Sequence, residues 1–414
     1  MLQMIKARPE VGLKPEAHKR VLQGHPWVFS NEIAMEPEVK ALKPGAVVRL
    51  VSAGGEALGT AIFNRRPLIA ARLLSRDPEA AIDETFFRGR IEAALRLRER
   101  FFDRPYYRLI HAESDGLPGT IIDRFGDCLV IQVNTAGMDR LLPDLLAALD
   151  RVLAPKTVVL RNDSPAREME GLGSEFRLAK GSLDGPVELV ENGLRFLADL
   201  REGQKTGWFF DQRRNRAQVA ALCRDARVLD LYCFSGGFSV QAAAAGAAEV
   251  TGIDRSEAAL ELAGQAAALN GVAETCRFEK REVLAHLGKL AEQRQSFDVV
   301  ICDPPAFIKS KKDYWQGLKG YRKLVRLAAR LVAPGGLLFV ASCSHHADLP
   351  AFTQQVARGL AGAGREGRIL ASLGAAPDHP VHPTVPETAY LKAHLLALDG
   401  GPERPALAAS EADD

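Results

Sequence analysis

The chain has 414 residues, of which 47% are hydrophobic and 26% charged, and its formal net charge is +2. This composition is ordinary for a soluble globular protein, and the near-zero net charge leaves any affinity for nucleic acid to local basic patches. No charge-free apolar run approaches the length of a membrane span, and the six cysteines show no C-x-x-C spacing. We therefore expect a cytoplasmic protein of two or three domains, with no membrane partner and no metal site.

Residues 1–75 are typical of a small β-rich domain. Runs of β-prone residues at 27–29, 46–51 and 68–74 are separated by Gly and Pro, which predicts short strands joined by turns. Basic and aromatic side chains gather near the first run. They are His18, Lys19, Arg20, His25 and Trp27. This mixture suits the phosphates and bases of RNA, although a solvated basic edge would have the same composition.

Residues 76–190 form a second segment, which we expect to be an α+β connecting domain. The predicted helices and strands cover 84–100, 120–123, 128–133, 140–153 and 158–160. His111, Ser114 and Asp115 are the residue types of a hydrolase triad. They share a single loop, however, whereas a triad draws on separate elements, so we interpret this segment as a structural connector.

The chain is organised around residues 227–254, which predict a strand, a glycine turn, a helix and a second strand. The turn at 235–237 lacks the G-x-G-x-x-G pattern, which weakens a dinucleotide interpretation. Asp230 ends the first strand, where its carboxylate would repel a pyrophosphate but not a cationic or zwitterionic ligand. Asp254 ends the second strand, where an acid can accept hydrogen bonds from ribose hydroxyls. The pattern favours S-adenosylmethionine over NAD, and a βαβ unit without a ligand is the alternative.

The regular α/β pattern continues from 191 to 399 and predicts a mostly parallel sheet, whereas 400–414 reads as a disordered acidic tail. Helices are predicted at 238–247 and 283–295. Further strands are predicted at 298–301, 336–341, 368–372 and 390–398.

Two of these strands end in groups that suit catalysis. Asp303 follows the first and is held by two prolines, which make a rigid loop, although a plain strand exit is the alternative. Cys343 follows the second and lies just before two histidines, and a cationic imidazole would favour its thiolate form. A cysteine is more often a small buried hydrophobe, which is how we interpret Cys302.

A basic stretch begins directly after the Asp-Pro-Pro loop. Residues 306–330 hold eight Lys and Arg residues against one acid, Asp313. Tyr314 and Trp315 interrupt the run and could stack on splayed bases. An amphipathic helix with a solvated basic face explains the later cations, but it explains Lys309, Lys311 and Lys312 less well because they precede the predicted helix.

Several segments carry, in order, a family resemblance. They are GHPWVFSNE at 24–32, QKTG at 204–207 with DQR at 211–213, LDLYCFSGGF at 229–238, DPPAF at 303–307 and SCS at 342–344. Together they resemble the class I S-adenosylmethionine-dependent methyltransferases that form 5-methylcytosine in large-subunit ribosomal RNA. The resemblance implies an N-terminal PUA-type RNA-binding domain at 1–75, an α+β domain at 76–190 and a Rossmann-like methyltransferase domain at 191–399.

The resemblance also implies roles for individual residues. Cys343 would add to carbon 6 of cytosine, and Asp303 would hydrogen-bond the ring and favour its activated form. The loop at 303–307 lacks the second cysteine of many such enzymes, so a single-cysteine mechanism is implied, and the group that removes the carbon-5 proton stays unassigned. The expected cofactor contacts are Lys205, Thr206, Asp230, Phe234, Ser235, Gly236, Asp254 and Glu282. The expected RNA contacts are Lys19, Arg20, His25, Trp27, Lys309, Lys311 and Lys312.

Two functions of other kinds remain open at this point. The chain could methylate an exocyclic amine of RNA, with Cys343 incidental, or it could bind RNA with a degenerate methyltransferase domain. The partners expected for the preferred function are S-adenosylmethionine, large-subunit ribosomal RNA that is free or partly assembled, and a second copy of the chain in a homodimer.

Overall fold

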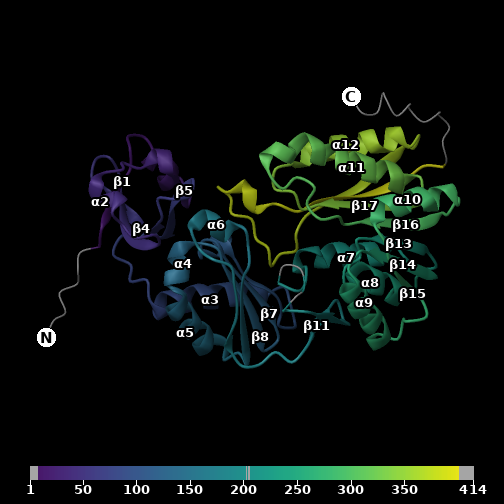
Figure 1. Ribbon diagram of the computed structural model, residues 1–414, viewed down its shortest axis with the longest axis horizontal. Coiled ribbons are helices and arrows are strands. Elements are labelled where there is room, and N and C mark those ends of the chain that lie inside the picture. The colour runs from purple at the N-terminus through teal and green to yellow at the C-terminus, as the bar shows by residue number, and fades with distance from the viewer. Residues whose placement is uncertain (1–7, 202, 204–205, 401–414) are drawn as a thin grey trace. The chain divides into compact units, whose positions relative to one another are not determined.

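The computed structural model describes residues 8–201, 203 and 206–400. The chain forms two compact units, and it passes between them several times (Figure 1). Unit 1 comprises Met1–Gly185, Gln204–Thr206 and Pro377–Thr388, and unit 2 comprises Pro186–Gly203, Gly207–Ala376 and Ala389–Asp414. The predicted domain boundaries near residues 75 and 190 stay a prediction.

Unit 1 contains two five-stranded sheets. The first has the order β1-β3-β4-β5-β2, with β1 (Glu10–Gly12), β2 (Trp27–Phe29), β3 (Ala46–Val51), β4 (Ala57–Phe63) and β5 (Ile69–Ser75). The second has the order β10-β9-β8-β7-β6, with β6 (Tyr106–His111), β7 (Thr120–Phe125), β8 (Cys128–Val133), β9 (Thr157–Asn162) and β10 (Glu175–Lys180). One core cluster contains Ile62 and Leu74 from the first sheet and Ile122 and Ile131 from the second, so the two sheets share buried apolar surface.

Helices cover part of these sheets. They are α1 (His18–Leu22), α2 (Pro37–Lys40), α3 (Glu84–Arg98), α4 (Ala136–Arg140), α5 (Leu142–Leu153) and α6 (Ala166–Glu170). Helix α3 begins at the predicted position because the Asp83 side chain accepts the N–H of Phe86 (3.0 Å), which caps the first turn. Helices α3 and α5 pack against each other and bury Phe87, Ile91 and Leu145 in the same core.

Unit 2 contains a hairpin and a seven-stranded sheet. The hairpin pairs β11 (Val187–Glu191) with β12 (Leu194–Ala198). The sheet has the order β15-β14-β13-β16-β17-β19-β18, with β13 (Arg227–Leu231), β14 (Glu249–Asp254), β15 (Cys276–Lys280), β16 (Phe297–Cys302), β17 (Val332–Ser342), β18 (Gly367–Leu373) and β19 (Lys392–Leu398). Strands β13 to β17 are parallel, and β19 is antiparallel to both β17 and β18. Strand order reverses beside β13, where ligands bind in sheets of this type.

Helices lie on both faces of this sheet (Figure 1). They are α7 (Arg213–Ala220), α8 (Gly237–Ala244), α9 (Glu257–Leu269), α10 (Val283–Glu292), α11 (Tyr314–Ala329) and α12 (Leu349–Gly362). One core cluster joins the strands to α10, α11 and α12, and another joins them to α7 and α8. This arrangement confirms the predicted fold class, a Rossmann-like α/β domain that follows β-rich and α+β segments.

Some predicted boundaries differ from the structure. Strand β17 begins at Val332 rather than at 336, because Val332 pairs with Phe297 across an irregular step in the ladder. Strand β4 was not predicted, since its sequence ALGTAIF contains Ala and Gly, which have low β-propensity. It is nonetheless the middle strand of its sheet and is buried over most of its length.

Candidate active site

The loop after β13 adopts an unusual backbone conformation. Tyr232 and Phe234 have positive φ angles of 63° and 50°, which non-glycine residues rarely adopt, and Gly236 has a φ of 80°. At Gly236 a Cβ atom would lie 2.9 Å from the Cβ of Ala263, so a side chain there would also collide with α9. Strained loops of this kind occur at ligand sites, where the surrounding structure maintains them.

Asp230 is fully buried at the end of β13. Its Oδ2 accepts a hydrogen bond from the hydroxyl of Ser239 (2.6 Å), whereas its Oδ1 has no partner among the described residues. Burial raises the pKa of the Asp230 carboxyl to about 7, against the opposing effect of the Ser239 hydrogen bond. The hydroxyl of Ser235 is also buried without a described partner. These two atoms fit the amino group of a bound methionine moiety, which donates hydrogen bonds.

Asp254 is the last residue of β14, and Glu282 follows the neighbouring strand β15. The Asp254 carboxylate accepts the backbone N–H of Phe234 (3.1 Å) and of Ser256 (2.9 Å), so it ties the strained loop to the end of β14. Each carboxylate oxygen has further acceptor capacity, which a ribose hydroxyl could use. Glu282 is the N-cap of α10 and accepts the N–H of Ala285 (2.8 Å), which gives its side chain a structural role.

Of the expected cofactor contacts, Lys205 lies outside the described residues. Thr206 belongs to unit 1 and is fully buried. Its hydroxyl donates to the carboxylate of Asp123, which Arg108 also binds. The Thr206 side chain is therefore used within unit 1. Phe234 contacts Phe209 edge-to-face, with ring centroids 5.2 Å apart.

Asp303 and Cys343 follow β16 and β17, which are parallel neighbours paired at Cys302 and Val340. Both residues therefore leave the sheet at the edge that also carries Asp230. Both are partly buried, whereas Cys302 is fully buried, as predicted. Burial raises the pKa of the Cys302 thiol, so it stays protonated at neutral pH.

A hydrogen-bond chain that the sequence did not reveal fixes Asp303. Its Oδ1 accepts from Nε2 of Gln212 (2.8 Å), and Oε1 of Gln212 accepts from Nδ2 of Asn215 (2.6 Å). Asn215 also donates to the carbonyl oxygen of Gly374 (3.2 Å). The segment DQR at 211–213 was noticed for its resemblance, but nothing in it indicated that Gln212 would meet Asp303.

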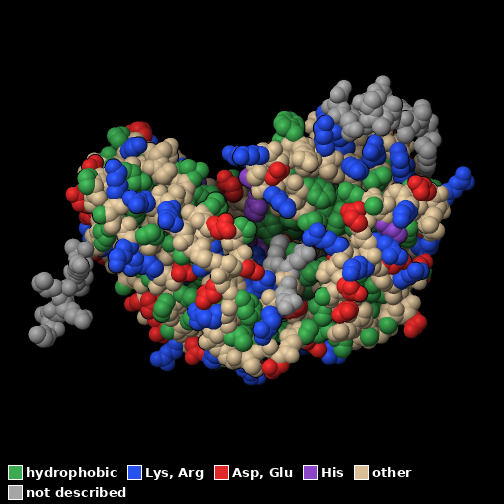
Figure 2. Space-filling view, viewed as in Figure 1, with side chains coloured by type: hydrophobic (Ala, Val, Ile, Leu, Met, Phe, Trp, Pro, Cys, Tyr) green, Lys and Arg blue, Asp and Glu red, His purple; other side chains and the backbone are tan. Residues whose placement is uncertain are grey.

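The basic stretch after Asp303 is partly exposed as predicted. Lys309, Lys311 and Lys312 are exposed, and 75% of the Trp315 surface is accessible. Arg322 corrects the prediction, because it is buried at 5% exposure and lies on the inner side of α11. Figure 2 shows Lys and Arg side chains mixed with acidic ones over the face in view, in keeping with the small net charge.

The expected RNA contacts near the N-terminus are mostly used inside unit 1. Arg20 pairs with Glu32 (2.7 Å) and lies over the ring of Phe29. The indole N–H of Trp27 donates to Glu113 (2.8 Å). His25 accepts the N–H of Trp27 at Nδ1 (3.1 Å). Burial, assisted by Arg20, lowers the His25 pKa, so this imidazole is neutral at pH 7.

Lys19 is exposed beside Glu16. Its side chain faces solvent, whereas Arg20, His25 and Trp27 are partly buried.

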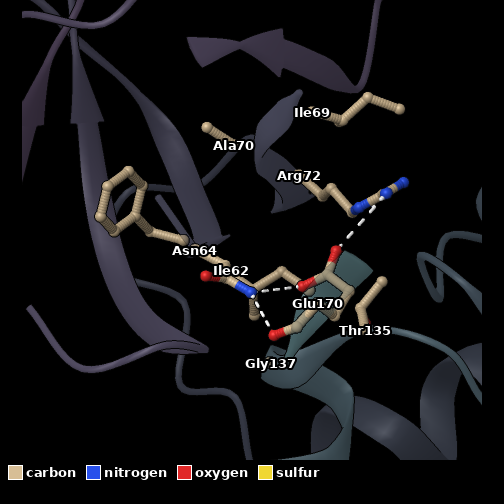
Figure 3. Close-up of a pocket in the computed structure, with 9 residues that line it drawn as sticks. Ile62, Asn64, Ile69, Ala70, Arg72, Thr135, Gly137 and Glu170 are labelled. Carbon is tan, nitrogen blue, oxygen red and sulfur yellow. Dashed lines mark hydrogen bonds and ion pairs between the residues drawn. The ribbon is translucent and has the colours of Figure 1, made fainter. Parts of the chain in front are cut away.

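A small pocket in unit 1 illustrates the same internal use of polar groups (Figure 3). Its volume is about 10 Å³, enough for a single water molecule. Glu170 accepts from Nδ2 of Asn64 (2.7 Å) and lies 3.7 Å from Arg72, which also pairs with Glu113 (2.8 Å). We interpret this pocket as a structural polar cluster.

Among the described residues, no three His, Cys, Asp or Glu side chains are grouped as metal ligands would be. No described helix is both long and apolar enough to cross a membrane.

Comparisons with known proteins bear on the family. A sequence model described as S-adenosylmethionine-dependent methyltransferase matches residues 175–397, and one described as a PUA-like domain matches 11–76. Two relatives share the name Ribosomal RNA large subunit methyltransferase I. The protein from Pseudoalteromonas atlantica is 35% identical over 92% of this chain and 97% of its own, and that from Aeromonas hydrophila is 37% identical over 90% and 95%.

Solved structures show the same fold. A methyltransferase complexed with SAH aligns with a TM-score of 0.80 and 21% identity over 94% of this chain and 99% of its own. A SAM-dependent methyltransferase from Streptococcus mutans aligns with a TM-score of 0.79 and 21% identity over 94% and 100%. The chain therefore belongs to the S-adenosylmethionine-dependent methyltransferases, in the family of the relatives named Ribosomal RNA large subunit methyltransferase I, and it carries a PUA-like domain.

Proposed function

We propose that the protein forms 5-methylcytosine in large-subunit ribosomal RNA, with Cys343 as the covalent nucleophile. The observation that carries the proposal is the position of Asp303 and Cys343 after neighbouring parallel strands, at the sheet edge where Asp230 lies near the end of β13. The names of the relatives support ribosomal RNA as the substrate.

The cofactor residues of this chain have distinct tasks in the proposal. S-adenosylmethionine supplies an electrophilic methyl group when it is bound. Asp230 and Ser235 offer two buried oxygens without described partners for its amino group, and Asp254 offers spare acceptor capacity for ribose hydroxyls. Phe234 and Gly236 belong to the strained loop between these acids, which shapes the wall of the site.

The residues that contact the cytosine base must activate its carbon 5, which is a poor nucleophile. Carbon 5 of cytosine becomes enamine-like when the Cys343 thiolate adds to carbon 6, which is covalent catalysis. Asp303, oriented by Gln212, hydrogen-bonds the ring and favours its activated form. The cytosine must leave its stack to reach these groups. Lys309, Lys311 and Lys312 follow Asp303 in the chain and bind phosphates of the RNA.

The proposal has further parts. The RNA substrate is free or partly assembled, and the protein acts in the cytoplasm as a homodimer. The domain boundaries lie at 75, 190 and 399.

Replacing the nucleophile tests the proposal. We expect Cys343→Ala to abolish 5-methylcytosine formation in deproteinised ribosomal RNA, measured by nucleoside mass spectrometry, and to leave cofactor affinity in calorimetry unchanged. Cys276→Ala, at the other partly buried cysteine, is the matched control and should stay active. A fully active Cys343→Ala enzyme, or methyl groups found only on an exocyclic amine, would contradict the covalent mechanism.

Replacing Asp254, the proposed partner of the ribose hydroxyls, tests the cofactor site separately. Asp254→Ala should weaken S-adenosylmethionine binding by about 1–3 kcal/mol, the range for hydrogen bonds to a charged group. Asp254→Asn, which keeps one acceptor oxygen, should have a smaller effect. Equal affinity of all three proteins in a titration would show that Asp254 does not contact the cofactor.

A further inference from the structure

Lys392 is a buried lysine beside the exit of β17. It begins β19, which pairs antiparallel with β17 so that Lys392 lies opposite Ser342. The residue is only 7% exposed. Its Nζ donates to the carbonyl oxygen of Ser344 (2.7 Å) and to that of Tyr390 (3.0 Å). Lys392 therefore holds the backbone at the residue that immediately follows Cys343.

Ser344 is also anchored from the opposite side. Its hydroxyl oxygen lies 2.8 Å from the hydroxyl of Tyr321 and accepts the N–H of Ile308 (3.2 Å). The Tyr321 hydroxyl in turn accepts the N–H of Phe307 (3.4 Å). Because Phe307 and Ile308 continue the Asp-Pro-Pro loop, these bonds join the loop that carries Asp303 to the strand exit that carries Cys343.

Lys392 is electrostatically coupled to Cys343. Burial lowers the pKa of Lys392, while the charges of Cys343 and Asp348 oppose that shift, so the ammonium group and the thiolate stabilise each other. His345 and His346 are exposed, and the His345 ring stacks on that of Tyr390 with centroids 5.2 Å apart. The described titratable groups of the packed elements include Lys392 and His394 on β19, Tyr321 and Arg322 on α11, Asp348 before α12, Cys302 at the end of β16, Asp303 after β16, and His345, His346 and Tyr390 in the adjoining loops.

We propose that Lys392 is a positioning residue for the nucleophile, which fixes the backbone after Cys343 and, as a buried cation, favours the thiolate form of Cys343. The proposal rests on the proposed function, in which that thiolate attacks cytosine. To the histidines that the sequence suggested it adds a lysine that is distant in sequence and adjacent through strand pairing.

The pH dependence of Cys343 alkylation tests the role of the charge without RNA or cofactor. Iodoacetamide labelling of the full chain, followed peptide by peptide in mass spectrometry, reports Cys343 alone. The other half-buried cysteine, Cys276, has its pKa raised to about 12 by burial and should react slowly. We expect the wild-type midpoint below about 8.5, the value for an unperturbed cysteine. Lys392→Met should move the midpoint up by about one unit, which slows labelling at pH 7 about tenfold.

Matched variants separate charge from structure. Lys392→Arg keeps the cation and should keep a low midpoint, whereas Tyr321→Phe removes an anchor of Ser344 but no positive charge, so its labelling profile should match the wild type. A Lys392→Met profile identical to the wild type would overturn the proposal. If Lys392→Met does not fold, a wild-type midpoint at or above about 8.5 overturns it instead. A fully active Cys343→Ala enzyme contradicts the proposed function without altering these labelling results, so the two failures are distinguishable.

Discussion

The two units differ in how their charged residues are paired. In unit 1 buried charges are paired: Arg98 binds both oxygens of Asp115 at 2.7 Å, and Arg108 binds both oxygens of Asp123 at 2.8 and 2.9 Å. Unit 2 has buried pairs too, such as Glu191 with Arg216 (2.7 Å). At its sheet edge, however, a carboxylate oxygen of the buried Asp230 lacks a described partner, and lysines after Asp303 face solvent.

This difference shows why basic and aromatic composition alone does not locate a binding site. The N-terminal group and the stretch after Asp303 both combine cations with aromatic rings. The structure uses Arg20 and Trp27 for internal contacts but leaves Lys309 and Trp315 exposed. A buried ion pair contributes to the fold, whereas an exposed cluster of like charges is available to a polyanion. Substitutions on the two sides of this contrast should differ in their effect on the free energy of unfolding, which we expect to be largest at Arg98 and smallest at the lysines after Asp303.

The largest change is expected for Arg98→Leu. Arg98 is fully buried, and its loss leaves the buried Asp115 carboxylate without its charge partner. Removing one partner of a buried ion pair destabilises by about 3–5 kcal/mol. Urea denaturation should show this loss, while Arg96→Leu, at an exposed arginine of the same helix, should stay within about 0.5 kcal/mol of the wild type. Similar losses in the two variants would contradict the contrast.

A pH dependence is expected from Asp230. Its pKa is about 7 in the folded protein and 3.8 in the unfolded reference, so between these values the native state binds a proton that the unfolded chain releases. The free energy of unfolding therefore falls as the pH rises through this window, by at most about 4 kcal/mol at about 1.36 kcal/mol per pKa unit. Asp230→Asn, which resembles the protonated acid, should remove the fall. Parallel stability curves for the two proteins would show that Asp230 does not titrate there.

A smaller change is expected for Trp27→Phe. The substitution keeps an aromatic ring but removes the N–H that donates to the buried carboxylate of Glu113, and such a loss costs about 1–3 kcal/mol. RNA affinity and its salt dependence should stay unchanged. Trp315→Phe is the matched control, because the exposed indole should contribute nothing measurable to stability. A Trp27→Phe protein of full stability with weaker RNA binding would restore the original RNA-contact prediction for this residue.

The sequence predicted the sheet edge well and its supporting residues poorly. Asp230, Asp254 and Asp303 were found because each follows a short apolar run, and such a run defines both a buried strand and its end. Lys392 and Gln212 were missed because their roles depend on partners far along the chain, which periodicity cannot supply. The register of β19 on β17, rather than any local motif, places a lysine beside Cys343.

The same limit applies to charges. The sequence shows which residues are cations but not which partners they have. Arg20 and the buried Arg322 therefore looked as available to RNA as Lys309. Thr206 looked like a cofactor contact, although Asp123 accepts its hydroxyl within unit 1. Exposure and pairing are properties of the folded chain, and among the expected RNA contacts Lys19 and the lysines before α11 are exposed.

The smallest change in stability is expected for the triple variant Lys309→Ala, Lys311→Ala and Lys312→Ala, and this variant tests the exposed side of the contrast. The three side chains face solvent, so unfolding should change by no more than about 0.5 kcal/mol per site. RNA binding should nevertheless weaken, because each lost phosphate contact flattens the salt dependence by about 0.7–0.9 in slope. The matched control replaces Arg224, Lys289 and Arg294, three exposed cations elsewhere in unit 2, and so removes the same charge. If both triple variants lose the same slope, RNA responds only to net charge; if only the first does, the loop after Asp303 contacts phosphates directly. A wild-type slope in the first variant would leave RNA binding to other cations, of which Lys19 in unit 1 is exposed.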